Sequence, residues 1–350
     1  MIMSLKTSIA VVLAACFTMF SASALAEEPQ IDAQSACVID SATGNELYAK
    51  NADQRMYPGG TTMMMTSILG VESGKLDTVM TVSDASQQLA GDVSRLGIYP
   101  GDKVTLRNAL TGMMTVGGCD VAYDAAVTVS PSLDSFVQSM NEKAASIGAS
   151  HTHFTNPAGL PDENHYSTAR DLAKIGAYAM KSADFRGLVN HASFDMPYAD
   201  SGTKHCETTN EFLTSGFAGA DGIKTGATND GGPCLVASAT RNGHTLVASI
   251  LNSGDRAGDA AALLTYGFER LSAPAAAVKN VTTATTATAA EKAAIAASQA
   301  VTQTGRASNA PADADEAYVL RDAPAGQTLS QIAAQQKQAA RIAAENQNEK

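Results

Sequence analysis

Apolar and polar residues alternate on both sides of a short polar turn near the start of the chain, in "SACVIDSATGNELYAK" over residues 35–50. Alternation of this kind places one set of side chains on each face of a strand, and residues 41–45 between the two runs are turn formers. The pattern predicts a β-hairpin. From Asp221 onward, short apolar runs separated by Gly, Asn and Asp predict an antiparallel meander of three strands.

Between these two strand regions the apolar residues recur at helical spacing. We expect helices over 61–74, over 105–114 with Thr105 as the N-cap, over 132–147 and over 167–180. "DAAALLTYGFERL" predicts a closing helix that ends near Leu271. Strands at both ends with helices between them indicate an α+β fold, in which helices cover an antiparallel sheet and a helical insertion forms a second lobe.

The two ends of the 350-residue chain differ from this central region. Lys6, the apolar run over 8–20 and "SALA" ending at Ala26 predict a signal peptide over 1–26, so that the mature chain is periplasmic or secreted. A lipoprotein cleavage site at "LAAC", before Cys16, is the alternative. The folded domain is then expected over 27–272.

Residues 273–350 are expected to form a low-complexity tail rich in Ala, Thr and Gln. Such a segment buries too little apolar surface to offset the entropy lost on ordering. One helix over 328–345 is possible, with Thr328 and Gln331 as a capping box. Its apolar stripe is mostly alanine, so we expect no strong membrane anchor.

The charge and the cysteine content argue against nucleic-acid and metal binding, but they do not determine how the cysteines pair. The net charge of -11 argues against nucleic-acid binding, which needs a basic surface. No CxxC occurs and the H-x-H of His151 and His153 has no further ligands at suitable spacing, so we expect neither metal nor cofactor. An oxidising compartment permits disulfides, but sequence alone does not pair the four cysteines of the mature chain. These are Cys37, Cys119, Cys206 and Cys234.

One sequence motif is similar to a signature of a known enzyme family. "DGIKTG" over 221–226 resembles the third signature of the serine DD-peptidases, and further similarity runs through most of 30–271, including "GIYPGDKVTLRNAL" and "THFTNPAGLPDENHYSTARDLAKIGAYAMK". The chain is therefore identified as resembling the D-alanyl-D-alanine carboxypeptidases, which are low-molecular-mass penicillin-binding proteins. The resemblance implies a β-lactamase-like fold and a peptidoglycan stem peptide as ligand. It also implies that Lys224, Thr225 and Gly226 form an edge strand that binds this peptide and its terminal carboxylate.

The other two signatures of that family are altered. Its first motif reads like "YPASTTKMMT", whereas this chain has "YPGGTTMMMT", which puts Gly60 at the nucleophile position and Met63 at the position of the basic lysine. Glycine has no nucleophile, and methionine takes up no proton. The second motif, "SGN" in the family, falls on Gly117, Gly118 and Cys119. The resemblance therefore implies a docking edge without the attacking groups.

Other residues near these motifs could in principle replace the lost nucleophile. Thr61, Thr62 and Cys119 are candidate nucleophiles, but no lysine occurs over 51–74 or over 104–142 to serve as their base. His153 and His165 lie where the family has ordinary scaffold. We therefore expect a catalytically impaired protein that binds stem peptides or a cell-wall enzyme. The alternatives are an active carboxypeptidase with a substitute nucleophile and a structural protein that binds partners through its tail.

Overall fold

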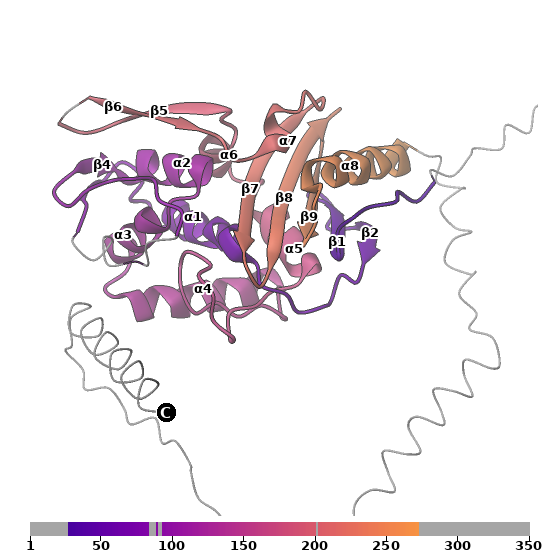
Figure 1. Cartoon of the computed structure of the whole chain (residues 1–350), viewed down its shortest axis with the longest axis horizontal. Coiled ribbons are helices and arrows are strands. Elements are labelled where there is room, and N and C mark those ends of the chain that lie inside the picture. The colour runs from indigo at the N-terminus through magenta and orange to yellow at the C-terminus, as the bar shows by residue number, and fades with distance from the viewer. Residues whose placement is uncertain (1–26, 84–88, 90–92, 201, 273–350) are drawn as a thin grey trace, which may run out of the picture. The chain divides into compact units, whose positions relative to one another are not determined.

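A five-stranded antiparallel sheet with the strand order β2-β1-β9-β8-β7 forms the centre of this computed structural model (Figure 1). The first two strands are the predicted hairpin, β1 (Ser35–Asp40) and β2 (Glu46–Lys50). The last three are the predicted meander, β7 (Ala220–Thr228), β8 (Gly232–Arg241) and β9 (His244–Leu251). Pairing of β1 with β9 joins the two ends of the domain, which leaves β7 at one edge of the sheet.

The structure describes residues 27–83, 89, 93–200 and 202–272. The expected signal peptide over 1–26 and the expected tail over 273–350 lie outside the described residues. Pro29–Phe268 lies within one compact unit. Among the described residues, none of the helices has the length and apolar character needed to cross a membrane.

The sheet is covered by helices, as predicted, and the structure places them on both of its faces. A Cβ atom at Gly176 of α5 (Ala169–Ala179) would lie 2.9 Å from Val247, and one at Gly267 of α8 (Arg256–Ser272) would lie 2.7 Å from Leu246. Successive residues of a strand point to opposite faces, so α5 and α8 pack on opposite sides of β9. Glycine at these two helix positions allows the close approach.

Further helices form the second lobe beside β7, again as predicted (Figure 1). At its centre is the buried helix α1 (Met63–Glu72), which follows a 3-10 turn, η1 (Gly59–Thr62). The other helices are α2 (Leu106–Val116), α3 (Cys119–Val129), α4 (Leu133–Ile147) and α6 (Ala183–Val189). The predicted cap is present, because the hydroxyl of Thr105 accepts a hydrogen bond from the Asn108 amide at 3.2 Å.

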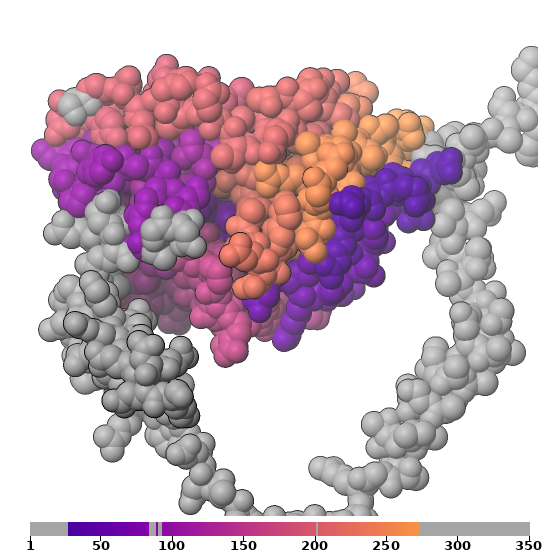
Figure 2. All heavy atoms as spheres, viewed as in Figure 1, coloured from indigo at the N-terminus to yellow at the C-terminus, as the bar shows by residue number. Residues whose placement is uncertain are grey.

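Several small elements were not predicted from the sequence. Strands β3 (Val79–Thr81) and β4 (Lys103–Thr105) form one short hairpin, and a four-residue helix, α7 (Glu211–Thr214), precedes β7. Strands β5 (Ser193–Pro197) and β6 (Thr203–Glu207) form a second hairpin, which lies along α2 at the surface (Figure 2). Helix α3 begins at Gly118 without a side-chain cap, so the usual start signal is missing from the sequence.

The four cysteines that the sequence left unpaired are all buried and free in the described structure. None of them forms a disulfide bond within this part of the chain.

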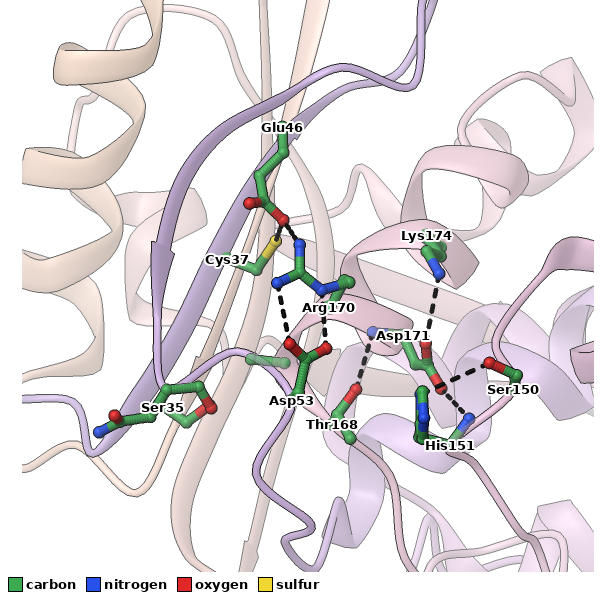
Figure 3. A network of polar contacts seen from close by, with 12 residues as sticks. Ser35, Cys37, Glu46, Asp53, Ser150, His151, Thr168, Arg170, Asp171 and Lys174 are labelled. Carbon is green, nitrogen blue, oxygen red and sulfur yellow. Dashed lines mark hydrogen bonds and ion pairs between the residues drawn. The ribbon is translucent and has the colours of Figure 1, made fainter. Parts of the chain in front are cut away.

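Arg170 ties the terminal hairpin to α5 (Figure 3). Its guanidinium donates to both carboxylate oxygens of Asp53, at 2.8 and 3.1 Å, and forms an ion pair with Glu46 of β2. The backbone amide of Arg170 also donates to the carbonyl of Ala52 at 3.0 Å. A two-point contact of this kind orients the guanidinium more firmly than a single exposed ion pair does.

We expect Arg170→Ala to lower the free energy of unfolding by about 1–2 kcal/mol, because it removes charge-assisted hydrogen bonds between partly exposed groups. Urea unfolding followed by circular dichroism measures this difference. Lys181→Ala, at an exposed residue just after α5, is the control and should change little. Equal stability of the two variants would contradict a role for the Arg170 network.

Candidate functional site

Residues of the three predicted motifs meet at the edge of the sheet. We call the turn of Gly117 and Gly118, between α2 and α3, the second-motif turn. It lies beside η1 and β7, and we call the place where these three meet the junction. A Cβ atom at Gly60 would lie 3.2 Å from the carbonyl oxygen of Thr225, and one at Gly117 would lie 3.5 Å from Lys224 Nζ. Residues far apart in the sequence are thus within contact distance.

Gly226 is required at the junction for steric reasons. A Cβ atom on it would lie 2.7 Å from the amide nitrogen of Gly60 and 2.9 Å from that of Thr61. Distances below 3 Å leave no room for any side chain against backbone, so only glycine allows β7 to lie this close to η1. Packing alone therefore accounts for the third residue of the K-T-G motif.

Met63 is part of the hydrophobic core. It is the first residue of α1, it is 1% exposed, and the two methionines after it are fully buried. A flexible thioether chain fills irregular space well. The position at which the family resemblance places a base thus holds an apolar side chain with no proton-accepting group.

The two threonines that follow Gly60 are buried, and their hydroxyl groups are already engaged. Thr61 Oγ1 donates to the carbonyl oxygen of Pro58 at 2.7 Å. Thr62 Oγ1 lies 2.9 Å from His165 Nε2. A hydroxyl beside an imidazole has the composition of a nucleophile with its base.

The tautomer of His165 argues against that role. Its Nδ1 accepts a hydrogen bond from the backbone amide of Thr155 at 3.1 Å, so the proton of the neutral ring is on Nε2 and is donated to Thr62. Burial lowers the pKa of His165 to about 4, which keeps the ring neutral near pH 7. The nitrogen next to Thr62 therefore has no free lone pair with which to accept the hydroxyl proton.

The thiol of Cys119 is also a poor nucleophile. Burial, followed by the negative charge of Asp120, raises its pKa to about 11, although Lys224 acts in the opposite direction. The side chain is 6% exposed. Cys119 is therefore a protonated, buried thiol near neutral pH.

Gly117 ends α2 in the left-handed conformation, with φ of 90°. A Cβ atom there would lie 3.3 Å from Ser94 Oγ as well as 3.5 Å from Lys224 Nζ. The hydroxyl of Ser94 and the amine of Lys224 therefore border the same small volume beside the second-motif turn.

Asp120 fixes the loop that contains Ser94. Its carboxylate accepts hydrogen bonds from the backbone amides of Leu96, Gly97 and Ile98 at 2.9, 2.8 and 3.4 Å. The amide of Cys119 donates to the carbonyl oxygen of Ser94 at 2.9 Å. Sequence reasoning missed both Ser94 and Asp120. The available signal was an aspartate in the first turn of a helix that starts after two glycines.

Lys224 is a buried cation at the junction. It is 1% exposed, and burial followed by the nearby Arg256 lowers its pKa to about 8. Its hydrogen bond within the described chain is to Thr225 Oγ1 at 3.4 Å. The hydroxyl of Thr225 lies 2.7 Å from that of Thr209, which comes from the loop after β6. Lys224 has no carboxylate within ion-pair distance among the described residues, so a buried cation faces the junction without a counter-ion.

Arg256 adds a second cation behind β7. Its guanidinium contacts the carbonyl oxygens of Gly226 and Cys234 at 3.4 Å and binds both carboxylate oxygens of Glu211 at 2.9 and 3.0 Å. Because Glu211 compensates its charge, Arg256 acts on the junction mainly by supporting β7. No group of three or more His, Cys, Asp or Glu residues suited to a metal ion occurs in the described residues.

We expect Cys119 to react slowly with iodoacetamide in the native protein. A pKa of about 11 leaves roughly one thiol in a thousand ionised at pH 8. Peptide mass spectrometry of native and urea-unfolded samples compares the rates, and unfolding should accelerate labelling at this residue by more than about tenfold. Rapid native labelling at Cys119 would restore it as a candidate nucleophile.

Comparison with known proteins agrees with this geometry. A family model described as D-alanyl-D-alanine carboxypeptidase matches residues 22–255. The chain is 34% identical to the D-alanyl-D-alanine carboxypeptidase of Streptomyces sp. (strain K15), over 69% of this chain and 89% of that protein. It is 33% identical to Escherichia coli (strain K12) DacA, over 69% of this chain and 62% of that protein.

Solved structures give the same result. The crystal structure of the Streptomyces K15 DD-transpeptidase is similar with a TM-score of 0.66 and 34% identity, covering 69% of this chain and 99% of that one. A Mycobacterium tuberculosis H37Rv D-alanyl-D-alanine carboxypeptidase has a TM-score of 0.63 and 30% identity, covering 69% and 93%. The expected DD-peptidase fold is confirmed, and the chain belongs to the D-alanyl-D-alanine carboxypeptidase family.

Proposed function

We propose that this protein is a non-catalytic member of its family, which binds peptidoglycan stem peptides through the edge of β7 and acts in the periplasm or outside the cell. Lys224 and Thr225 receive the terminal carboxylate of the peptide, and Gly226 allows β7 to lie against η1. Gly60 and Met63 occupy the positions of the lost nucleophile and base. The signal peptide over 1–26 directs export.

The proposal that the protein binds a peptide rests on one observation. Lys224 is buried and has no carboxylate partner among the described residues. A pKa lowered from 10.5 to about 8 corresponds to about 3 kcal/mol by which the fold disfavours the charged amine. A methionine at this position would pack in the same space without that cost. Packing accounts for Gly226 but leaves Lys224 unexplained, so we assign the lysine to an anionic ligand.

The catalytic half rests on what surrounds the lost groups. Loss of a nucleophile or base in a serine hydrolase reduces the rate by about 10⁶, or roughly 8 kcal/mol of barrier. The hydroxyls of Thr61 and Thr62 are engaged and lack a base, and Cys119 is protonated. These contacts disfavour an active enzyme with a substitute nucleophile. The alternative in which the tail is the working part concerns residues outside the described structure.

The first test measures binding of an N-acylated peptide ending in D-Ala-D-Ala by calorimetry. We expect Lys224→Met to weaken binding at least about tenfold, since it removes a charge-assisted contact to the carboxylate. The variant should fold, because an apolar side chain replaces a buried charge. Lys181→Met, at an exposed lysine, is the matched control.

The same binding should depend on pH in a defined direction. Lys224 binds a carboxylate only while protonated, so affinity should fall as the pH rises through about 8. The other groups that act on its charge are the neighbouring guanidinium of Arg256 and the thiol of Cys119, whose pKa of about 11 lies above this range. A peptide with a C-terminal amide should show no such dependence. If the free acid does not bind at pH 7, the protein has another ligand, and a cell-wall enzyme becomes the leading candidate.

A second test restores the lost groups. We expect wild-type protein to form no covalent adduct with a fluorescent penicillin that survives denaturation, and the double variant Gly60→Ser/Met63→Lys to form one slowly. The backbone at Gly60 is not left-handed, and a Cβ there needs a shift of only a few tenths of an ångström at Thr225. Each single variant, lacking one partner, is the control. A stable adduct with the wild type would refute the non-catalytic assignment.

A further inference from the structure

We infer that Ser94 replaces the hydroxyl that the second-motif turn lacks, and that Ser94 Oγ and Lys224 Nζ together bind one carboxylate oxygen of the ligand. This inference rests on the proposed function and names a contact residue for it. The ligand group is a free monoanionic carboxylate at the end of a peptide.

The positions of the two groups support a shared ligand atom. The point at which Gly117 would carry a Cβ lies 3.3 Å from Ser94 Oγ and 3.5 Å from Lys224 Nζ, so the two donors border the same face of Gly117 and are at most 3.3 + 3.5 = 6.8 Å apart. Hydrogen bonds to a carboxylate are about 2.7–2.9 Å long, so small rotations of the two side chains bring both donors into range. Gly117 places no side chain between the two donors.

The backbone of Ser94 is held in place by α3, and this restricts the position of its hydroxyl group. Its carbonyl oxygen is bound by the amide of Cys119 at 2.9 Å, and Asp120 holds the next residues of the loop through three backbone amides. The backbone of Ser94 is thus fixed to the start of α3, while its side chain is exposed. A fixed backbone that presents an exposed hydroxyl is what a pre-organised contact requires.

The present partner of the Ser94 hydroxyl is easily exchanged. Ser94 Oγ donates to the carbonyl oxygen of Val116 at 3.4 Å, which is long for a hydroxyl hydrogen bond. A carboxylate beside the ammonium of Lys224 is a stronger acceptor than this carbonyl.

The combination of donors selects the ligand class. A buried ammonium and an exposed hydroxyl both donate, and Lys224 has no counter-ion among the described residues. A neutral amide at the same place would offer the ammonium a weaker acceptor and leave its charge uncompensated. The pair therefore favours a peptide with a free carboxyl end over the same peptide with an amide end.

The test compares Ser94→Ala with Ser94→Thr by calorimetry, using an N-acylated D-Ala-D-Ala peptide and its C-terminal amide. We expect Ser94→Ala to weaken binding of the free acid by about 5–20-fold and Ser94→Thr, which keeps the hydroxyl, to retain most of it. Ser146→Ala is the matched control, since this exposed hydroxyl on α4 also donates to a backbone carbonyl. Undiminished binding by Ser94→Ala, with binding by the wild type intact, overturns the inference and leaves the proposed function standing.

A second measurement decides the case in which the wild type does not bind the peptide. Acetate is titrated into protein with ¹³C-labelled lysine, and the Lys224 Cε signal, assigned through Lys224→Met, is followed. A shift that saturates in wild type and is lost in Ser94→Ala supports the shared anion site, with a ligand other than the stem peptide. No shift in the wild type, or an equal shift in Ser94→Ala, overturns it.

Discussion

The contact between two stretches of bare backbone sets the geometry of this protein. Gly226 of β7 lies against the amides of Gly60 and Thr61, at a separation that excludes a Cβ on Gly226. This approach seats η1 on the edge of the sheet and fixes where α1 begins. The core helix, the second lobe packed around it and the orientation of Lys224 toward the second-motif turn all depend on this contact.

The contact also separates the structural from the functional part of the third motif. Gly226 would be retained in any protein that packs η1 on β7, whether or not it binds a ligand. Lys224 makes the fold less stable than an apolar residue would, because its buried ammonium loses hydration without gaining a counter-ion from the part of the chain that the structure describes. The packing of the fold therefore explains Gly226, whereas Lys224 indicates that an anion binds there.

The sequence predicted the elements whose signals are local. Each of these signals is formed by residues that are neighbours in the sequence: the alternation over 35–50, the turn residues of the meander and the cap at Thr105. Each predicted element is present in the structure. Helix α3 escaped prediction because its N-cap is a glycine with no side-chain acceptor. Ser94 escaped for a different reason. It reaches the second-motif turn only because Asp120 binds backbone amides more than twenty residues away, and such a contact leaves no periodic pattern in the sequence.

The exchange of a base for Met63 has an electrostatic consequence for the charge that remains. A lysine at the start of α1 would place a second buried cation on the helix that follows η1, and like charges lower each other's pKa. Arg256 already acts on Lys224 in this direction, although Glu211 compensates much of its charge. With methionine at position 63, Lys224 keeps a pKa of about 8 and stays mostly protonated near neutral pH. The substitution that removes the proton acceptor thus also favours the charged form of Lys224. A site whose lysine is mostly protonated near neutral pH is suited to holding a carboxylate rather than cleaving a peptide.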